Sequence, residues 1–248
     1  MPASPRRRPA KLPATLERNA RLDALRGLAL LWMTAFHFCF DLAWFRLANW
    51  NFYTDPRWTV QRTLIVSLFL LVAGLAQGLA GPRSAAAFWR RWGQIAGCAA
   101  LVTIASWFAF PQSFIHFGVL HGIALMTLLL RPLLPLKIAD RWWLLAGAAA
   151  LALPWLIAHP LFDSRWLNWV GLVTAKPITE DYLPLFPWLG VMLWGVALAR
   201  WSARQSPALL TGPLPATLRP LAAIGRWSLI WYMLHQPLLL GSLLLLTR

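Results

Sequence analysis

The sequence predicts an all-α fold: a polytopic helical bundle that is integral to a membrane. Two features of composition favour this class, because 59% of the 248 residues are hydrophobic and only 12% are charged. The third observation is that apolar runs of about 20 residues, the length with which a helix crosses a bilayer, recur along the chain. The formal net charge of +15 would favour a nucleic-acid partner in a soluble protein. Here the basic residues lie in short gaps between apolar runs, so they indicate topology and contacts with membrane lipids, and no nucleic acid is expected.

Seven apolar windows predict about seven transmembrane helices. They cover residues 24–45, 60–80, 89–109, 114–131, 142–158, 184–201 and 225–246. Residues 1–20 are basic and rich in proline, and they predict a disordered tail. The first apolar run is too long and too polar for a signal peptide, so the tail is expected to be retained. Because the remainder shows no internal repeat, residues 21–248 are predicted to form a single transmembrane domain.

The basic residues are shared unequally between alternate gaps, and the richer side is expected to be cytoplasmic. Seventeen lie on the side of the N-terminus: Arg6, Arg7, Arg8, Lys11, Arg18, Arg21, Arg26, Arg83, Arg90, Arg91, Arg131, Lys137, Arg141, Arg200, Arg204, Arg219 and Arg226. Six lie on the opposite side: Arg46, Arg57, Arg62, Arg165, Lys176 and Arg248. The N-terminus is therefore predicted to be cytoplasmic and the C-terminus to lie outside.

The longest gap, residues 159–183, lies outside by this orientation. It collects three carboxylates, Asp163, Glu180 and Asp181, and is long enough to hold a short interfacial helix. Loops of this length are more often functional than idle. Asp181 begins the segment DYLPLFPW, just before the sixth apolar run. Its carboxylate could favour the start of that helix through the helix dipole, or it could bind hydroxyl groups of an acceptor together with Tyr182.

The first apolar run contains two ionisable residues, His37 and Asp41, well inside its length. Ionisable groups at such depth are costly and mark functional sites. Positions i and i+4 lie on one helix face, so a hydrogen bond between the two side chains is expected. A carboxylate beside an imidazole orients the ring and stabilises its protonated form, which prepares a general base. The alternative is a buried polar pair that fixes helix packing.

Two further histidines are predicted to lie at a similar depth. His37 is eleven positions from Arg26, about 16 Å along a helix. His235 is ten positions from Gly225, about 15 Å along the last helix. His121 lies about 10 Å below the outer surface in the fourth helix. The three residues could line one cavity, although each imidazole of the latter two could equally bond a neighbouring helix.

Five segments in order resemble the heparan-α-glucosaminide N-acetyltransferase catalytic-domain family, a group related to the acyltransferase-3 superfamily. They are RLDALRG with its following His37 and Asp41, QRTLIVSLFLLVAG, FGVLHGIAL, DYLPLFPWLGVMLWG and IGRWSLIWYMLHQPL. The resemblance runs from about Arg21 to the C-terminus. It implies a membrane enzyme that transfers an acetyl group from acetyl-CoA to a sugar or glycan. It also implies a role for Arg26 in binding CoA phosphates, whereas alone Arg26 would be an ordinary topology anchor.

The sequence therefore predicts an acetyl-CoA-dependent O- or N-acetyltransferase of the bacterial inner membrane. Cytosolic acetyl-CoA would be the acyl donor, and a sugar, glycan or glycolipid outside would be the acceptor. His37 is the expected base and Asp41 its orienting group, with no metal required; the alternative is that His37 carries the acetyl group itself. The rival hypothesis is a transporter or flippase that uses the same polar layer for a proton or a headgroup.

Overall fold

The computed structural model describes residues 19–80 and 84–247, and within these ranges the regular structure is helical. The long helices are α1 (Ala20–Trp44), α2 (Pro56–Gly78), α3 (Ala85–Ala109), α4 (Val119–Leu130), α5 (Asp140–Leu156), α6 (Trp188–Gln205) and α9 (Ser228–Leu246). Shorter helices are α7 (Pro207–Thr211) and α8 (Arg219–Arg226), with 3₁₀ turns η1 (Pro160–Asp163), η2 (Asn168–Val170) and η3 (Ala216–Leu218). Each of the seven apolar windows thus contains a helix, which confirms the all-α class.

Four of the described helices, α1, α2, α3 and α9, are long and apolar enough to cross a membrane. The prediction of seven spans is supported only to this extent, because α4 has 12 residues and α5 has 17. The predicted tail, residues 1–20, lies outside the described residues except for its last two positions. There Asn19 caps α1 by accepting hydrogen bonds from the backbone of Arg21 and Leu22, so α1 begins at Ala20, before the predicted start.

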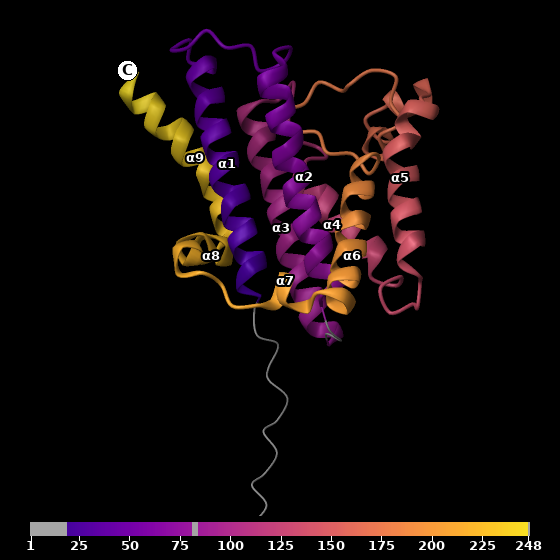
Figure 1. The fold of residues 1–248 in the computed structure, drawn as a ribbon. Helices are drawn as coiled ribbons and strands as arrows, with labels where there is room; N and C mark the ends of the chain where they lie inside the picture. The colour runs from indigo at the N-terminus through magenta and orange to yellow at the C-terminus, as the bar shows by residue number, and fades with distance from the viewer. Residues whose placement is uncertain (1–18, 81–83, 248) are drawn as a thin grey trace, which may run out of the picture.

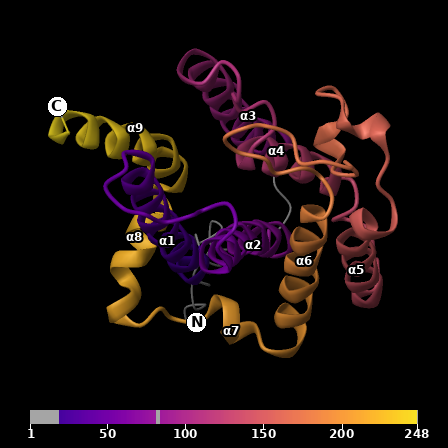
Figure 2. The same ribbon diagram turned by 90° about the horizontal axis from the view of Figure 1, so that it is seen from above.

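The helices stand side by side, with α1 and α2 in the middle (Figures 1 and 2). Beyond α1 lie α8 and α9, and beyond α2 lie α6 and then α5, while α3 and α4 form a separate pair on one side. The starts of α1 and α5 and the end of α6 lie at the same end of the bundle (Figure 1). We call this the basic end, because it carries Arg26, Arg141 and Arg204.

Glycines allow the tightest helix contacts in the bundle. A Cβ atom at Gly225 of α8 would lie 1.8 Å from the carbonyl oxygen of Asp23, and one at Gly27 of α1 would lie 2.0 Å from that of Leu221. Between α2 and α6, a Cβ atom at Gly74 would lie 2.1 Å from the carbonyl oxygen of Met192. Small residues permit such close backbone approach between membrane helices. The α8 helix, which the sequence did not predict, is fixed to α1 in this way.

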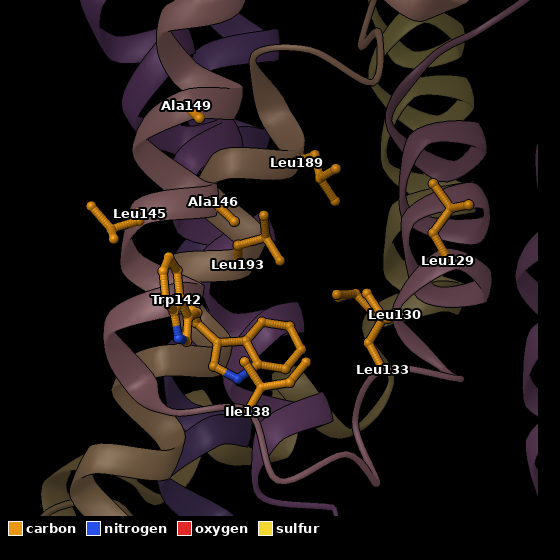
Figure 3. Close-up of a pocket in the computed structure, with 11 residues that line it drawn as sticks. Leu129, Leu130, Leu133, Ile138, Trp142, Leu145, Ala146, Ala149, Leu189 and Leu193 are labelled. Carbon is orange, nitrogen blue, oxygen red and sulfur yellow. The ribbon is translucent and has the colours of Figure 1, made fainter.

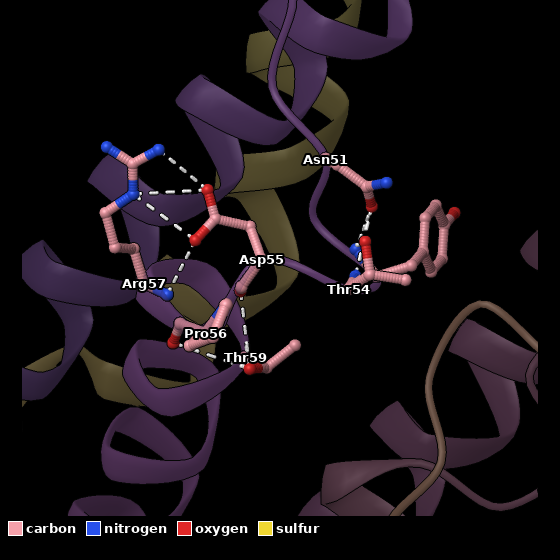
Figure 4. Close-up of polar contacts among 7 residues, drawn as sticks. Asn51, Thr54, Asp55, Pro56, Arg57 and Thr59 are labelled. Atoms are coloured by element: carbon pink, nitrogen blue, oxygen red, sulfur yellow. Dashed lines mark hydrogen bonds and ion pairs between the residues drawn. The ribbon is translucent and has the colours of Figure 1, made fainter.

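The connection between α1 and α2 is held by local side-chain hydrogen bonds (Figure 4). Asn51 accepts from the backbone N–H groups of Tyr53 and Thr54. Asp55 caps α2 by accepting from the backbone N–H of Arg57 at 2.9 Å, and its carboxylate also pairs with the Arg57 guanidinium at 2.8 Å. Such an exposed ion pair adds little stability. Its effect here is to define where α2 starts.

The segment between α5 and α6 contains two 3₁₀ turns, η1 and η2, in place of the single interfacial helix that its length allowed. Asp163 accepts hydrogen bonds from the backbone N–H and the hydroxyl of Thr174, at 2.7 and 2.5 Å. These bonds lower the pKa of Asp163. Farther along, Glu180 accepts from the hydroxyl of Ser113. We call residues 159–183 the long loop, and these contacts give it a defined path.

The orientation of the bundle remains a prediction, which reporter fusions can test. A reporter that is active only outside the cytoplasm should be active when fused after Arg248 and silent when fused after Arg204, because the basic residues concentrate on the side of the N-terminus. A silent fusion after Arg248 with an active fusion after Arg204 would reverse the orientation and contradict the charge argument.

Candidate active site

Two of the histidines singled out from the sequence meet inside the bundle. The ring centroids of His37, on α1, and His235, on α9, are 5.0 Å apart with the rings at 74°. His235 is buried and His37 is half-buried. The two residues are 198 positions apart in the chain, and the packing of α9 against α1 brings them together. We call them the histidine pair.

Backbone carbonyl groups orient both rings of the histidine pair. The Nδ1 atom of His37 lies 2.9 Å from the carbonyl oxygen of Met33, and that of His235 lies 2.7 Å from the carbonyl oxygen of Tyr232. A carbonyl oxygen can only accept, so Nδ1 carries the hydrogen in each ring and Nε2 keeps a lone pair. Each imidazole is therefore held in the tautomer that can take up a proton at Nε2.

The predicted hydrogen bond between His37 and Asp41 is not made in the described structure. Asp41, which is 1% exposed, instead accepts from the Nε2 of Gln236 on α9 at 2.7 Å. The His37 ring bonds to its own helix, because an imidazole can reach the carbonyl one turn back, and Gln236 occupies one carboxylate oxygen of Asp41. Asp41 thus lies about one helical turn after His37 on α1. It helps to join α1 to α9, and it does not orient the His37 ring.

Three buried polar atoms in this region have no hydrogen-bond partner among the described residues. They are Oδ2 of Asp41, Oε1 of Gln236 and Nε2 of His235. Buried polar atoms are nearly always satisfied in proteins, so each unsatisfied one calls for an explanation such as a bound group. One of the three atoms belongs to α1, and the other two belong to adjacent residues of α9. They supply two acceptors and one potential base to any polar ligand that enters.

A cavity of about 460 Å³ lies between α1, α2, α3, α4, α8 and α9 on the basic side of the histidine pair. Its polar lining includes three guanidinium groups, Arg26, Arg91 and Arg226, together with Gln77. Toward the histidine pair it is lined by Tyr232, whose ring centroid is 5.7 Å from that of His235. We call it the arginine cavity. It combines positive charge at one end with a proton acceptor close to the other.

Glycine packing explains why two of the arginines converge. Gly27 and Gly225 face each other across the α1–α8 contact, so the residues beside them, Arg26 and Arg226, reach the same cavity. The guanidinium of Arg26 also donates to Asp23 at 2.7 Å, and the Asp23 side chain is 1% exposed. Arg91 arrives from α3, whose Trp92 donates to the carbonyl oxygen of Ala124 and so ties α3 to α4.

His121 is not joined to the histidine pair by any contact that the structure shows. Its Nδ1 accepts from the backbone N–H of Gly118 at 3.2 Å, and its Nε2 lies 3.1 Å from the hydroxyl oxygen of Thr103. Since Nδ1 accepts, Nε2 carries the hydrogen and donates to Thr103. Both ring nitrogens are occupied, so His121 serves the start of α4 and the α3–α4 contact. Of the three histidines predicted to share a layer, His37 and His235 are in ring contact, and the described contacts of His121 are with α3 and the start of α4.

Asp181 caps a different helix from the one expected. Its carboxylate accepts from the backbone N–H of Val119 at 2.7 Å, so it caps α4 and not α6. Burial raises the pKa of the Asp181 carboxyl, although the Val119 hydrogen bond opposes this shift. Gly118 makes room for the carboxylate, since a Cβ atom there would lie 2.2 Å from its Oδ2. Val119 also lines the arginine cavity, so the Asp181 carboxylate contacts a residue of its wall.

Tyr182 follows Asp181 in the long loop and is held by contacts with Phe117 and with another residue of the loop, Asn168. Its backbone forms a bridge with Phe117, and its hydroxyl donates to the carbonyl oxygen of Asn168 at 2.6 Å. The side-chain amide oxygen of Asn168 lies 3.0 Å from the Nε2 of His116. Tyr182 is thus one part of a polar network that connects the long loop to the start of α4.

Sequence reasoning missed four residues of this site: Gln236, Tyr232, Arg91 and Arg226. The two arginines were visible only as loop cations that set topology, and their convergence on one cavity depends on helix contacts that spacing does not encode. Gln236 had a weak signal, because an amide next to a histidine in an apolar run needs a polar partner. Within the described residues, no three His, Cys, Asp or Glu side chains gather in a way that could hold a metal ion.

Comparison with known families decides the relationship. The family model described as heparan-alpha-glucosaminide N-acetyltransferase, catalytic, matches residues 18–237. The chain belongs to this family. No curated protein and no solved structure gives a significant match. The heparan-α-glucosaminide N-acetyltransferase family match confirms the resemblance seen in the sequence motifs, and it covers α1 to the middle of α9, including the histidine pair and the arginine cavity. Together with the four apolar helices, it indicates a membrane acetyltransferase.

Proposed function

We propose that the protein transfers an acetyl group from cytosolic acetyl-CoA to an amine or hydroxyl of an extracytoplasmic sugar, glycan or glycolipid. The reaction would take place within one transmembrane domain, residues 21–248, in the inner membrane of a bacterium. Family membership supports the acetyl transfer, since acetyltransferases of this family use acetyl-CoA as donor. The acetyl group would cross the membrane within the site, while donor and acceptor stay on their own sides.

The observation that carries this proposal is the arginine cavity and its position next to the histidine pair. CoA has a highly charged nucleotide end and a long, thin pantetheine arm that ends in the thioester. Guanidinium groups suit phosphates because their planar fork can bind two oxygens at once. Arg26, Arg91 and Arg226 would hold the phosphates, and the arm would follow α9 past Ser228, Leu229 and Tyr232. From Arg26 to His37 is eleven positions, about 16 Å along α1, a span suited to an extended arm.

The chemistry requires one base and no further reactant. The lone pair of an acceptor nitrogen or oxygen attacks the thioester carbonyl carbon, and Nε2 of His37 takes the proton from that atom. The carbon–sulfur bond then breaks, and the CoA thiolate takes the proton from the imidazolium. The second imidazole, His235, is 5.0 Å away between ring centroids and can position the thioester or share the proton. Asp41 and Gln236 stabilise the α1–α9 contact that sets this distance.

The acceptor would approach from the side of the long loop. Asp181, whose carboxylate contacts the Val119 that lines the arginine cavity, would accept from a sugar hydroxyl or amine. Tyr182 adds an aromatic face, and Trp166 in the same loop is 86% exposed. Aromatic faces and carboxylates together are suited to carbohydrate, which presents both C–H surfaces and hydroxyl groups.

Labelled acetyl-CoA tests the proposed function. Purified protein incubated with acetyl-labelled acetyl-CoA and an envelope fraction should release CoA and place the label on an envelope component, which mass spectrometry can identify. The Arg91→Gln variant should slow both, and boiled protein should show neither. A carrier or flippase has no reason to cleave a thioester. No CoA release above background, in the presence of the full envelope fraction, would therefore contradict the proposal and favour transport.

The link between Asp41 and Gln236 can be tested by stability. Gln236→Leu should lower the free energy of unfolding, measured by titration with a denaturing detergent, by about 1–3 kcal/mol, because a buried acceptor loses its donor. In the Gln236→Leu variant, the further change Asp41→Leu should lower the free energy of unfolding much less than it does in the wild-type chain. No buried polar group is then left without its partner. If the two effects are additive instead, the contact contributes nothing specific to the α1–α9 packing.

A further inference from the structure

A second cavity, of about 530 Å³, lies between α4, α5 and α6 and is apolar almost throughout (Figure 3). Leu129 and Leu130 of α4 line one side, and Ala146 of α5 and Leu193 of α6 line the other. The side chains of Leu129 and Ala146 are exposed, so the cavity is open to the surroundings of the bundle. In a membrane, those surroundings are lipid chains. We call it the apolar cavity, and it shares no lining residue with the arginine cavity.

Among the residues that line this cavity, one carries a buried polar atom without a partner. Trp143 lines it and is 3% exposed, and its Nε1 has no hydrogen-bond acceptor among the described residues. An indole N–H usually finds an acceptor when it is buried, because leaving it unpaired costs free energy. A hydrocarbon chain alone cannot supply that acceptor. An occupant with an ester or phosphate oxygen at one end of an acyl chain can.

Basic side chains surround the end of the cavity at which Trp143 lies. The guanidinium of Arg200 is 5.9 Å from the Trp143 ring centroid, and Arg141 precedes Trp143 by two positions in the first turn of α5. Lys137 is next to Ile138, which lines the cavity, and both Lys137 and Arg141 are exposed. The neighbouring carboxylate, Asp140, is already shared by Arg200 and Arg204. The charge at this end therefore favours an anionic headgroup.

We propose that the apolar cavity binds one acyl chain of an anionic glycerophospholipid from the leaflet at the basic end. The acyl ester carbonyl accepts the hydrogen bond of Trp143 Nε1, and the headgroup phosphate lies near Lys137 and Arg141. The bound lipid fills the space between the α3–α4 pair and the α5–α6 pair. This site is distinct from that of the proposed transfer reaction, because the two cavities share no lining residue.

Native mass spectrometry of the detergent-purified chain tests this site, with phosphatidylglycerol and phosphatidylcholine of the same acyl chains as probes. The protein should retain phosphatidylglycerol in preference to phosphatidylcholine. Trp143→Phe keeps the ring but removes the N–H, and it should weaken retention of both lipids about fivefold. Lys137→Gln with Arg141→Gln should reduce the preference for phosphatidylglycerol about tenfold.

A matched pair of variants tests the position of the lipid. Ala146→Trp fills the apolar cavity and should remove lipid retention, whereas Ala148→Trp, an exposed site on the same helix outside the cavity lining, should leave it unchanged. Both substitutions are at exposed positions, so folding should be preserved. Equal retention by the two variants, or equal affinity of the wild-type chain for the two lipids, would overturn the proposal.

Discussion

Replacing His37 with alanine is expected to lower acetyl transfer by about 10²–10⁴-fold, the usual contribution of a general base. The effect should fall on kcat, because the side chain is placed to act on the proton of the acceptor and contributes little to holding the phosphates of CoA. Binding of CoA to the variant, measured by calorimetry, should stay close to that of the wild-type chain. The structural reason is the orientation of the ring by Met33, which leaves Nε2 free to accept a proton.

Two other histidines complete this experiment. His235→Ala should also reduce transfer, and the double variant should be little worse than His37→Ala, because residues that act as one unit are not additive. His121→Ala should retain transfer, since both ring nitrogens of His121 are occupied by Gly118 and Thr103. If His235→Ala abolishes transfer while His37→Ala retains it, the base is on α9. If all three variants transfer acetyl groups normally, the histidine pair is structural and the proposed mechanism is wrong.

Replacing arginines of the arginine cavity is expected to raise the KM for acetyl-CoA by about tenfold or more for each residue, because a hydrogen bond to a charged group contributes about 1.5–3 kcal/mol. The loss of Arg26 would also disturb α1, because its guanidinium pairs with buried Asp23. Arg91, whose guanidinium donates to Gln94 of the same helix at 3.3 Å, gives the second variant, Arg91→Gln. Arg26→Lys should restore only part of the affinity that Arg26→Ala loses, because an ammonium lacks the planar fork of a guanidinium.

Arg90 supplies the matched control. It precedes Arg91 on α3 and carries the same charge, but it does not line the cavity. Arg90→Gln should therefore leave the KM for acetyl-CoA unchanged while altering the net charge as Arg91→Gln does. Equal effects of the two substitutions would mean that the arginines act only through general electrostatic attraction, and equal activity of all variants would return them to the role of topology anchors.

The helices could be predicted from the sequence because their signal is local. Runs such as the one around His37 are predominantly apolar, and each of the seven predicted windows contains a helix in the structure. The lengths of the helices were harder to predict, because apolar residues continue past the point where a helix ends. The window 114–131 begins with five residues outside the helix, among them Phe117, which bridges to Tyr182, and the cap residue Gly118, so α4 has only 12 residues.

The site was predictable in its components and not in its contacts. His37, His235 and Arg26 were identifiable, since ionisable residues within apolar runs are costly without a role. The hydrogen-bond partners of Asp41 and His37 were not identifiable. Helical spacing predicts that His37 and Asp41 share a helix face, but it cannot show that Gln236 of α9 donates to Asp41. The same limit applies to Arg226, which depends on the glycine contact between α1 and α8.

The most direct test of the central claim is an experimental structure of the protein in a lipid nanodisc with CoA bound. The account predicts that the CoA phosphates contact Arg26, Arg91 and Arg226, that the pantetheine arm follows α9 past Tyr232, and that the sulfur atom lies beside His37 and His235. CoA bound elsewhere, or bound in the arginine cavity with its sulfur directed away from the histidine pair, would contradict it.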